Sequence, residues 1–137
     1  MTMKKSALMA ILVLAPMAAA AWEPEAMTRL KETGDCPGCD LSDANLRWAN
    51  VYEAELAGAP NLVGAALSDA DLSGADLYGA NLEGADLRRS NLSGAKLSWA
   101  TLKGADLTGA DLTNATVDGV SFCNTTMPDG RIDDTNC

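Results

Sequence analysis

Cysteines are the side chains in this sequence with the most direct capacity for chemistry. Cys36 and Cys39 form a CxxC motif, while Cys123 and Cys137 lie near the C-terminus. A CxxC motif is typical of thiol redox sites and of one half of a tetrahedral zinc site. The other half is missing from the sequence, which has no second CxxC and no histidine. We therefore expect no metal site, no cofactor and no redox catalysis, and we expect structural disulfides instead.

Aspartates form the second group with possible chemistry, because five of them directly precede a leucine within residues 62–112. Carboxylates arranged in pairs could hydrolyse glycosides, and a ladder of them could bind Ca²⁺. However, a short repeat places Asp or Asn in this position again and again, and the glycine-rich nonapeptide of calcium-binding β-rolls is absent. The repeat accounts for the aspartates, so we predict that the protein is not an enzyme. The five residues are Asp71, Asp76, Asp86, Asp106 and Asp111.

The N-terminal residues have the order of a secretory signal peptide. Lys4 and Lys5 precede an apolar run over residues 7–17, and four alanines follow at 18–21. The apolar run is shorter than the roughly 20 residues that cross a bilayer, which argues against a transmembrane anchor. The sequence predicts a signal peptide over residues 1–21, cleaved near Ala20 or Ala21, and an exported protein that is periplasmic or extracellular and has no membrane anchor after cleavage.

The charge of the chain limits its partners. The formal net charge is −9, and loss of the two signal-peptide lysines changes it to −11, with 8 basic and 19 acidic residues remaining. Nucleic acids and anionic lipids require a basic surface. We therefore expect no direct binding of nucleic acid.

A five-residue repeat runs through most of the remaining chain. Leucine recurs every five residues from Leu62 to Leu112, with a small residue two places before it. This period matches neither a helix nor a plain strand, so the chain must turn every five residues. If the leucine and the small residue point inward, four such sides close a square coil of twenty residues.

In this repeat the sequence resembles the pentapeptide-repeat family. The resemblance implies an all-β fold, a right-handed quadrilateral β-helix of about five coils, over residues 39–137 with a C-terminal cap. Residues 22–38 would form an N-terminal capping segment, with a short helix from Pro24 to Thr33 that lays Met27 and Leu30 on the first coil. The six-residue interval from Leu56 to Leu62 indicates a local bulge. Past it, the inward columns would continue to Phe122, Met127, Ile132 and Val117 on the first to fourth faces.

The rod shape that the resemblance implies also bears on the cysteines. Four cysteines allow three connectivities, and two of these would join opposite ends of the rod, beyond the roughly 7 Å limit between bridged Cα atoms. This leaves disulfides between Cys36 and Cys39 and between Cys123 and Cys137.

Outward residues that the repeat does not require mark a possible interaction surface. Aromatic side chains beside arginine are typical of protein interfaces. Near one corner of the first coil lie Arg47, Trp48 and Tyr52. Two coils later, on the same second face, lie Arg88 and Arg89. On consecutive coils of the fourth face lie Tyr78 and Trp99.

These observations favour a non-enzymatic structural or protein-interaction scaffold with an unidentified protein partner. An alternative from another class is DNA mimicry, because some family members are acidic rods that bind DNA gyrase and confer quinolone tolerance. That activity is cytoplasmic, and its acidic stripe would be interrupted here by Arg47, Arg88, Arg89 and Lys96. The oligomeric state stays open.

Overall fold

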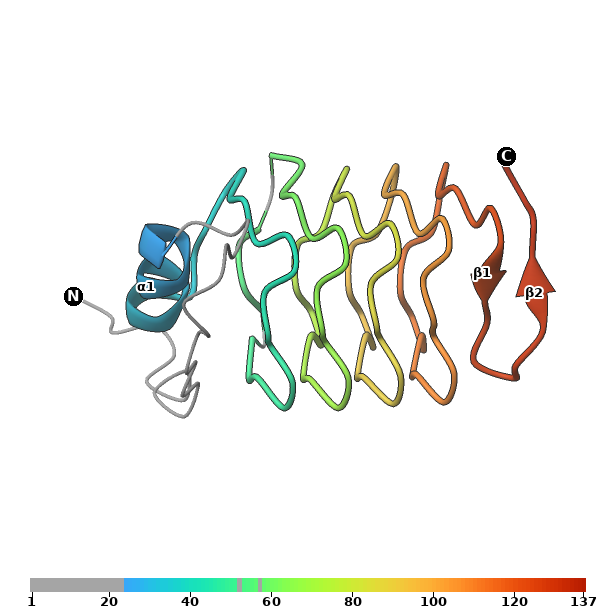
Figure 1. Cartoon of the computed structure of the whole chain (residues 1–137), viewed down its shortest axis with the longest axis horizontal. Helices are drawn as coiled ribbons and strands as arrows, with labels where there is room; N and C mark the ends of the chain where they lie inside the picture. The colour runs from blue at the N-terminus through green and yellow to red at the C-terminus, as the bar shows by residue number, and fades with distance from the viewer. Residues whose placement is uncertain (1–23, 52, 57) are drawn as a thin grey trace.

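The computed structural model describes residues 24–51, 53–56 and 58–137, so the expected signal peptide and Tyr52 lie outside the described residues. Helix α1 (Pro24–Thr33) lies at one end of a rod of stacked coils, and two short strands, β1 (Thr125–Thr126) and β2 (Ile132–Asp133), lie at the other (Figure 1). No helix in the described part of the chain is long and apolar enough to cross a membrane.

Four ladders of parallel bridges join successive coils. Residues twenty positions apart are bridged, and the interval is 21 wherever the ladder crosses the six-residue interval from Leu56 to Leu62, which contains one extra residue. The predicted register is therefore confirmed through the bulge. We number the faces by these ladders: the first is Asp40, Asn61, Asn81, Thr101, Ser121; the second Asn45, Ala66, Asp86, Asp106, Thr126; the third Asn50, Asp71, Asn91, Asp111; and the fourth Asp35, Glu55, Asp76, Lys96, Thr116.

The interior of the rod consists of stacked leucines and alanines. Leu62, Leu82 and Leu102, for example, lie in one column and are almost completely buried, as are Ala65, Ala85 and Ala105 in another. Burial of one such leucine stabilises the fold by about 1.5–3 kcal/mol. The leucine N–H groups donate along the rod, as Leu82 does to the carbonyl of Thr101 at 2.8 Å, so each coil satisfies the backbone of its neighbour.

Each repeat turns at the second residue after the inward leucine. Glycine usually occupies this turn position and has a left-handed conformation there, with φ of +67° at Gly84 and Gly104. Such a φ is unfavourable for residues with a Cβ atom. The glycines of the repeat therefore make the corners of the coil.

Helix α1 packs against the first coil. Ala26 and Leu30 are buried in the same core as Leu41, whereas the side chain of Met27 lies outside the described part of the structure. Gly34, with φ +72°, ends the helix, and its N–H donates to the carbonyl of Leu30 at 3.0 Å. The fourth-face ladder already begins at Asp35, within the segment that the sequence analysis assigned to the N-terminal cap.

The C-terminal residues depart from the predicted columns. Strand β1 pairs antiparallel with β2, so the chain reverses instead of continuing to the third face. The reversal follows from the turn at 128–130, where the Met127 N–H donates to the Arg131 carbonyl at 2.7 Å and Gly130 has φ +86°. The prediction that Ile132 points inward on the third face is therefore wrong, and its side chain is 55% exposed.

Candidate functional site

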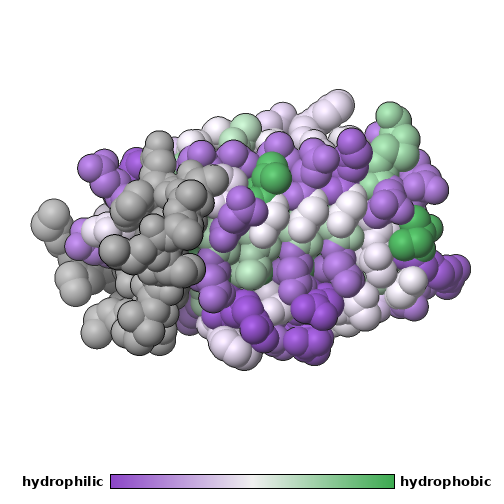
Figure 2. Space-filling model, in the orientation of Figure 1, coloured by the Kyte–Doolittle hydropathy of each residue, from purple (hydrophilic) through white to green (hydrophobic). Residues whose placement is uncertain are grey.

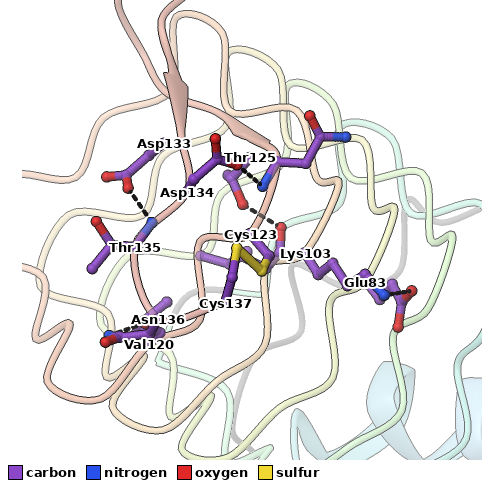
Figure 3. The surroundings of a disulfide bond; sticks show 12 residues. Glu83, Lys103, Val120, Cys123, Thr125, Asp133, Asp134, Thr135, Asn136 and Cys137 are labelled. Atoms are coloured by element: carbon purple, nitrogen blue, oxygen red, sulfur yellow. Dashed lines mark hydrogen bonds and ion pairs between the residues drawn. A yellow bond between two sulfur atoms is a disulfide. The ribbon is translucent and has the colours of Figure 1, made fainter.

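The four cysteines form two disulfides, between Cys36 and Cys39 and between Cys123 and Cys137. Their Cα atoms are 5.5 Å and 4.9 Å apart. The first disulfide is buried under α1, where Cys36 Sγ lies 3.3 Å from the Ala26 carbonyl oxygen. The second joins the C-terminal segment to the preceding coil (Figure 3). None of the described cysteines is free, and the described residues contain no group of three or more potential metal ligands.

The five candidate carboxylates have a structural role in the turns. Each accepts a hydrogen bond from the backbone N–H two residues further on, at 2.9–3.2 Å. Such Asx turns stabilise a change of chain direction. Each carboxylate therefore supports the turn after its leucine, which is a physical reason for Asp or Asn in that slot. The acceptors are Asp71, Asp76, Asp86, Asp106 and Asp111.

The residues of the expected interaction surface lie on two separate corners of the rod. Arg47, Trp48, Arg88 and Arg89 follow leucines of the second face, whereas Tyr78 and Trp99 follow leucines of the fourth face. In a coil with four ladders the second and fourth faces are opposite one another. The structure thus brings together the members of each group but does not join the groups.

On the second-face corner Arg47 and Trp48 act as one unit. The Arg47 guanidinium carbon lies 4.5 Å from the centroid of the Trp48 ring, within the range of a cation–π contact. Arg47 Nε also donates to the hydroxyl of the buried Ser68 on the next coil, at 3.0 Å. The sequence analysis did not single out Ser68, although a small polar residue beside Arg47 at an interval of 21 residues was a readable signal.

Ion pairs hold the other two arginines of this corner. Arg88 makes two hydrogen bonds to the carboxylate of Asp86, at 2.8 and 2.7 Å. Arg89 makes two to Asp69 on the preceding coil, at 2.8 and 2.9 Å. These guanidinium hydrogen bonds, offset in part by burial, lower the pKa values of Asp86 and Asp69. Both carboxylates are therefore charged at neutral pH, and the charges of this corner largely balance.

On the fourth-face corner Trp99 lies against the following coil. A Cβ atom added to Gly119 would be only 2.7 Å from Trp99 Cε3, so the indole ring lies directly over this glycine. The ring thus extends toward the C-terminal coil, away from Tyr78 on the preceding coil. Tyr78 is 52% exposed. On the face shown in Figure 2 the coils are mostly polar, and hydrophobic residues are few and separate.

Trp48 and Trp99 both occupy the turn position that glycine fills in most repeats. Their φ angles are +57° and +63°, in the left-handed region. A bulky residue there costs about 1–2 kcal/mol relative to glycine. Both side chains are nevertheless exposed, by 68% and 62%, so burial returns little of this energy. In the sequence, tryptophan in place of glycine at this turn position was the signal for an exposed, strained aromatic side chain.

Comparison with known proteins agrees with the repeat. The family model for pentapeptide repeats matches residues 38–59, 60–89 and 90–127, in eight copies. A pentapeptide repeat protein from the Arabidopsis thaliana thylakoid lumen is 30% identical over 74% of this chain and 70% of that chain, with a TM-score of 0.66. A pentapeptide repeat protein from Nostoc PCC 7120 is 40% identical over 64% of this chain and 63% of that one, with a TM-score of 0.42.

A more distant solved structure is full-length QnrB1, a plasmid-mediated fluoroquinolone resistance protein. It is 20% identical over 63% of this chain and 56% of that chain, with a TM-score of 0.40. Among curated proteins, no significant match is found. The matched repeats cover well over half of the chain and coincide with the four ladders. The chain therefore belongs to the pentapeptide-repeat family and has the right-handed β-helix fold of that family.

Proposed function

We propose that this protein is a non-enzymatic scaffold that binds a protein partner through Trp48 and Trp99. The observation that carries the proposal is the position of both indoles, which are exposed and lie in left-handed turns where glycine is the unstrained choice. Strained residues often cluster at functional sites, and these two are also bulky and mostly exposed. Binding would supply the burial that the isolated rod lacks.

The surroundings of both tryptophans suit a docking surface. Trp48 is oriented by Arg47, which is held by Ser68 in turn, so a partner would meet an ordered aromatic and cationic surface. Trp99 is oriented by its contact with Gly119. Tryptophan and arginine dominate the binding energy of many interfaces, and a pre-ordered side chain loses less entropy on binding. Two opposite corners would allow the rod to bridge two partners or two sites on one partner.

The alternative of DNA mimicry has weaker support from the same surface. A mimic needs a continuous stripe of carboxylates that replaces duplex phosphates. On the second-face corner Asp86 and Asp69 are instead neutralised by Arg88 and Arg89, and Arg47 adds a further positive charge. On the fourth face Lys96 lies 3.8 Å from Asp76. The purified protein is therefore expected to leave gyrase supercoiling unchanged.

The proposal includes an extracytoplasmic location and a capped rod. Two disulfides and a thylakoid-lumen relative support export, together with the signal-peptide pattern of residues 1–21. Helix α1 would act as the N-terminal cap of about five coils, because solenoids need their end coils covered. Mass spectrometry of the protein from an extracytoplasmic fraction should show loss of the signal peptide, and an intact N-terminus would contradict export.

The decisive experiment replaces each tryptophan with glycine. Because glycine relieves the left-handed strain, Trp48→Gly and Trp99→Gly should each change the free energy of unfolding by less than about 1 kcal/mol. Affinity capture of the partner from an extracytoplasmic extract should nevertheless fall at least tenfold. Asp43→Gly, at the same turn position with φ +57°, is the matched control and should retain capture. Unchanged capture by both tryptophan variants, or a loss of several kcal/mol in stability, would contradict the proposal.

A further inference from the structure

The C-terminal end of the rod is only half covered. After β1 the chain turns back, and the returning segment pairs with the second face through β2 and with the first face through the Phe122 N–H, which donates to the Thr135 carbonyl at 2.9 Å. The third and fourth faces of the last coil, residues 111–119, pair with the preceding coil, but no described residue pairs with them on the outer side. This half of the coil therefore ends in an unpaired sheet edge, at the end of the rod where β1 and β2 lie (Figure 1).

The open edge exposes backbone donors that are paired in the coil before it. There, the N–H groups of Leu92 and Leu97 donate to carbonyls of the last coil at 2.8 and 2.9 Å, as do those of Gly94 and Trp99 at 2.8 Å each. The equivalent groups one coil later have no partner within the described chain. Such an edge can accept an added strand. The four unpaired N–H groups belong to Leu112, Asn114, Val117 and Gly119.

Apolar side chains lie beside these donors and are uncovered. Val117 is 40% exposed, whereas Leu97, one coil earlier in the same column, is fully buried. Leu112 and Ala115 are likewise only partly buried where Leu92 and Ala95 are buried completely. The edge therefore lacks both hydrogen-bond partners and the next layer of the core.

The charges at the edge indicate what kind of segment would fit. Ion pairs between successive coils join residues twenty positions apart, as in Lys96 with Asp76 at 3.8 Å and Lys103 with Glu83 at 3.6 Å. Asp111 and Asp118 stand exposed on the last coil, where a further coil would place their counter-ions. Hydrogen bonds from Thr113 lower the pKa of Asp111, so this carboxylate is charged at neutral pH.

We propose that the edge over residues 111–119 binds an extended, positively charged segment of a partner protein. The segment adds as the next half-coil, places apolar residues five positions apart over Leu112 and Val117, and sets Lys or Arg over Asp111 and Asp118. Main-chain hydrogen bonds then supply affinity, and the apolar and charged positions supply specificity. This site is separate from the Trp48 corner and adjoins the Trp99 corner, because the Trp99 ring lies over Gly119. Peptide binding at the edge and partner capture by the tryptophans are measured separately, so each can fail without the other.

A designed peptide tests the proposal directly. The probe KLSGATLKGA follows the repeat, with apolar residues five apart and lysines in the two positions that face the aspartates, and DLSGATLDGA is the charge-reversed control. We expect the basic peptide to bind the full protein, as measured by fluorescence anisotropy, at least tenfold more tightly than the acidic one. Hydrogen exchange of the amides of Leu112, Asn114, Val117 and Gly119 should slow at least tenfold when the basic peptide is bound.

Charge variants identify the site. Asp118→Lys removes no described side-chain hydrogen bond and should weaken binding of the basic peptide. The double variant Asp111→Lys with Asp118→Lys should weaken this binding at least tenfold. Glu25→Lys with Glu32→Lys makes the same charge change on α1 at the opposite end and should retain binding. Equal weakening in both double variants would show non-specific attraction and overturn the proposal.

Exchange measurements on the unmodified protein keep the proposal testable even if a variant fails to fold. Absence of peptide-induced protection at the four amides would refute it. The four amides could instead become protected as the protein concentration rises, with no change when excess peptide is added. That result would assign the edge to a second copy of the chain and would also overturn the proposal.

Discussion

Substitution of Gly119 by alanine should displace the Trp99 ring without unfolding the coil. The added Cβ would lie 2.7, 2.8 and 2.9 Å from three atoms of the indole. These separations are about 0.5–0.7 Å shorter than an ordinary van der Waals contact near 3.4 Å, so the ring must move. Because the ring is mostly exposed, it can rotate into solvent instead of straining the backbone.

The magnitude follows from a comparison with Gly104. Both glycines have nearly the same φ, +69° and +67°, so alanine incurs a similar left-handed cost of about 1 kcal/mol at either position. No atom lies within 4 Å of the Cβ position at Gly104. The difference between the two variants therefore isolates the ring contact, which we expect to be worth less than about 1 kcal/mol.

The assay combines urea unfolding with fluorescence of Trp99 in a background where Trp22 and Trp48 are replaced by phenylalanine. Both variants should unfold cooperatively, with Gly119→Ala slightly less stable than Gly104→Ala. Only Gly119→Ala should make Trp99 more accessible to acrylamide. Equal quenching in the two variants would show that the ring does not lie over Gly119, and the argument for an oriented docking residue at this corner would fail.

Further predictions concern the core, acid stability and the C-terminal disulfide. Leu82→Ala should lower the free energy of unfolding by about 2–5 kcal/mol in a denaturant titration, whereas Asp86→Ala should have a much smaller effect; equal losses would refute the inward columns. The folded-state pKa of Asp69 is held below 3.8 by its paired guanidinium, so its stabilising effect is complete above that pH and is lost on further acidification. Melting temperatures between pH 2 and 7 should show a smaller acid decrease in Asp69→Asn than in the unmodified protein, and identical profiles would exclude this role. Cys123→Ser combined with Cys137→Ser should lower the free energy of unfolding by about 3 kcal/mol, as expected for a loop of this length. The same double variant should speed amide exchange in β2, and unchanged exchange would show that other contacts hold the strand.

The repeat and its register could be predicted from the sequence because each five-residue unit contains its own folding rule. A leucine and an alanine that point inward, an Asp or Asn that forms an Asx turn and a glycine that adopts a positive φ are local requirements. They recur often enough that one irregular interval, with Pro60 in the alanine slot, does not disturb the columns. The register of the four ladders and the burial of Leu82 and Ala85 follow from this pattern.

The ends and the surface depended on contacts between residues about twenty positions apart, which no single repeat specifies. The reversal that exposes Ile132 follows from β1 and β2 pairing across a turn, where the repeat alone predicted another inward side chain. The pairing of Arg89 with Asp69 likewise depends on the stacking of two coils. A linear pattern states which residues point outward, but only the stacked coils decide which outward residues meet, and which edge remains open.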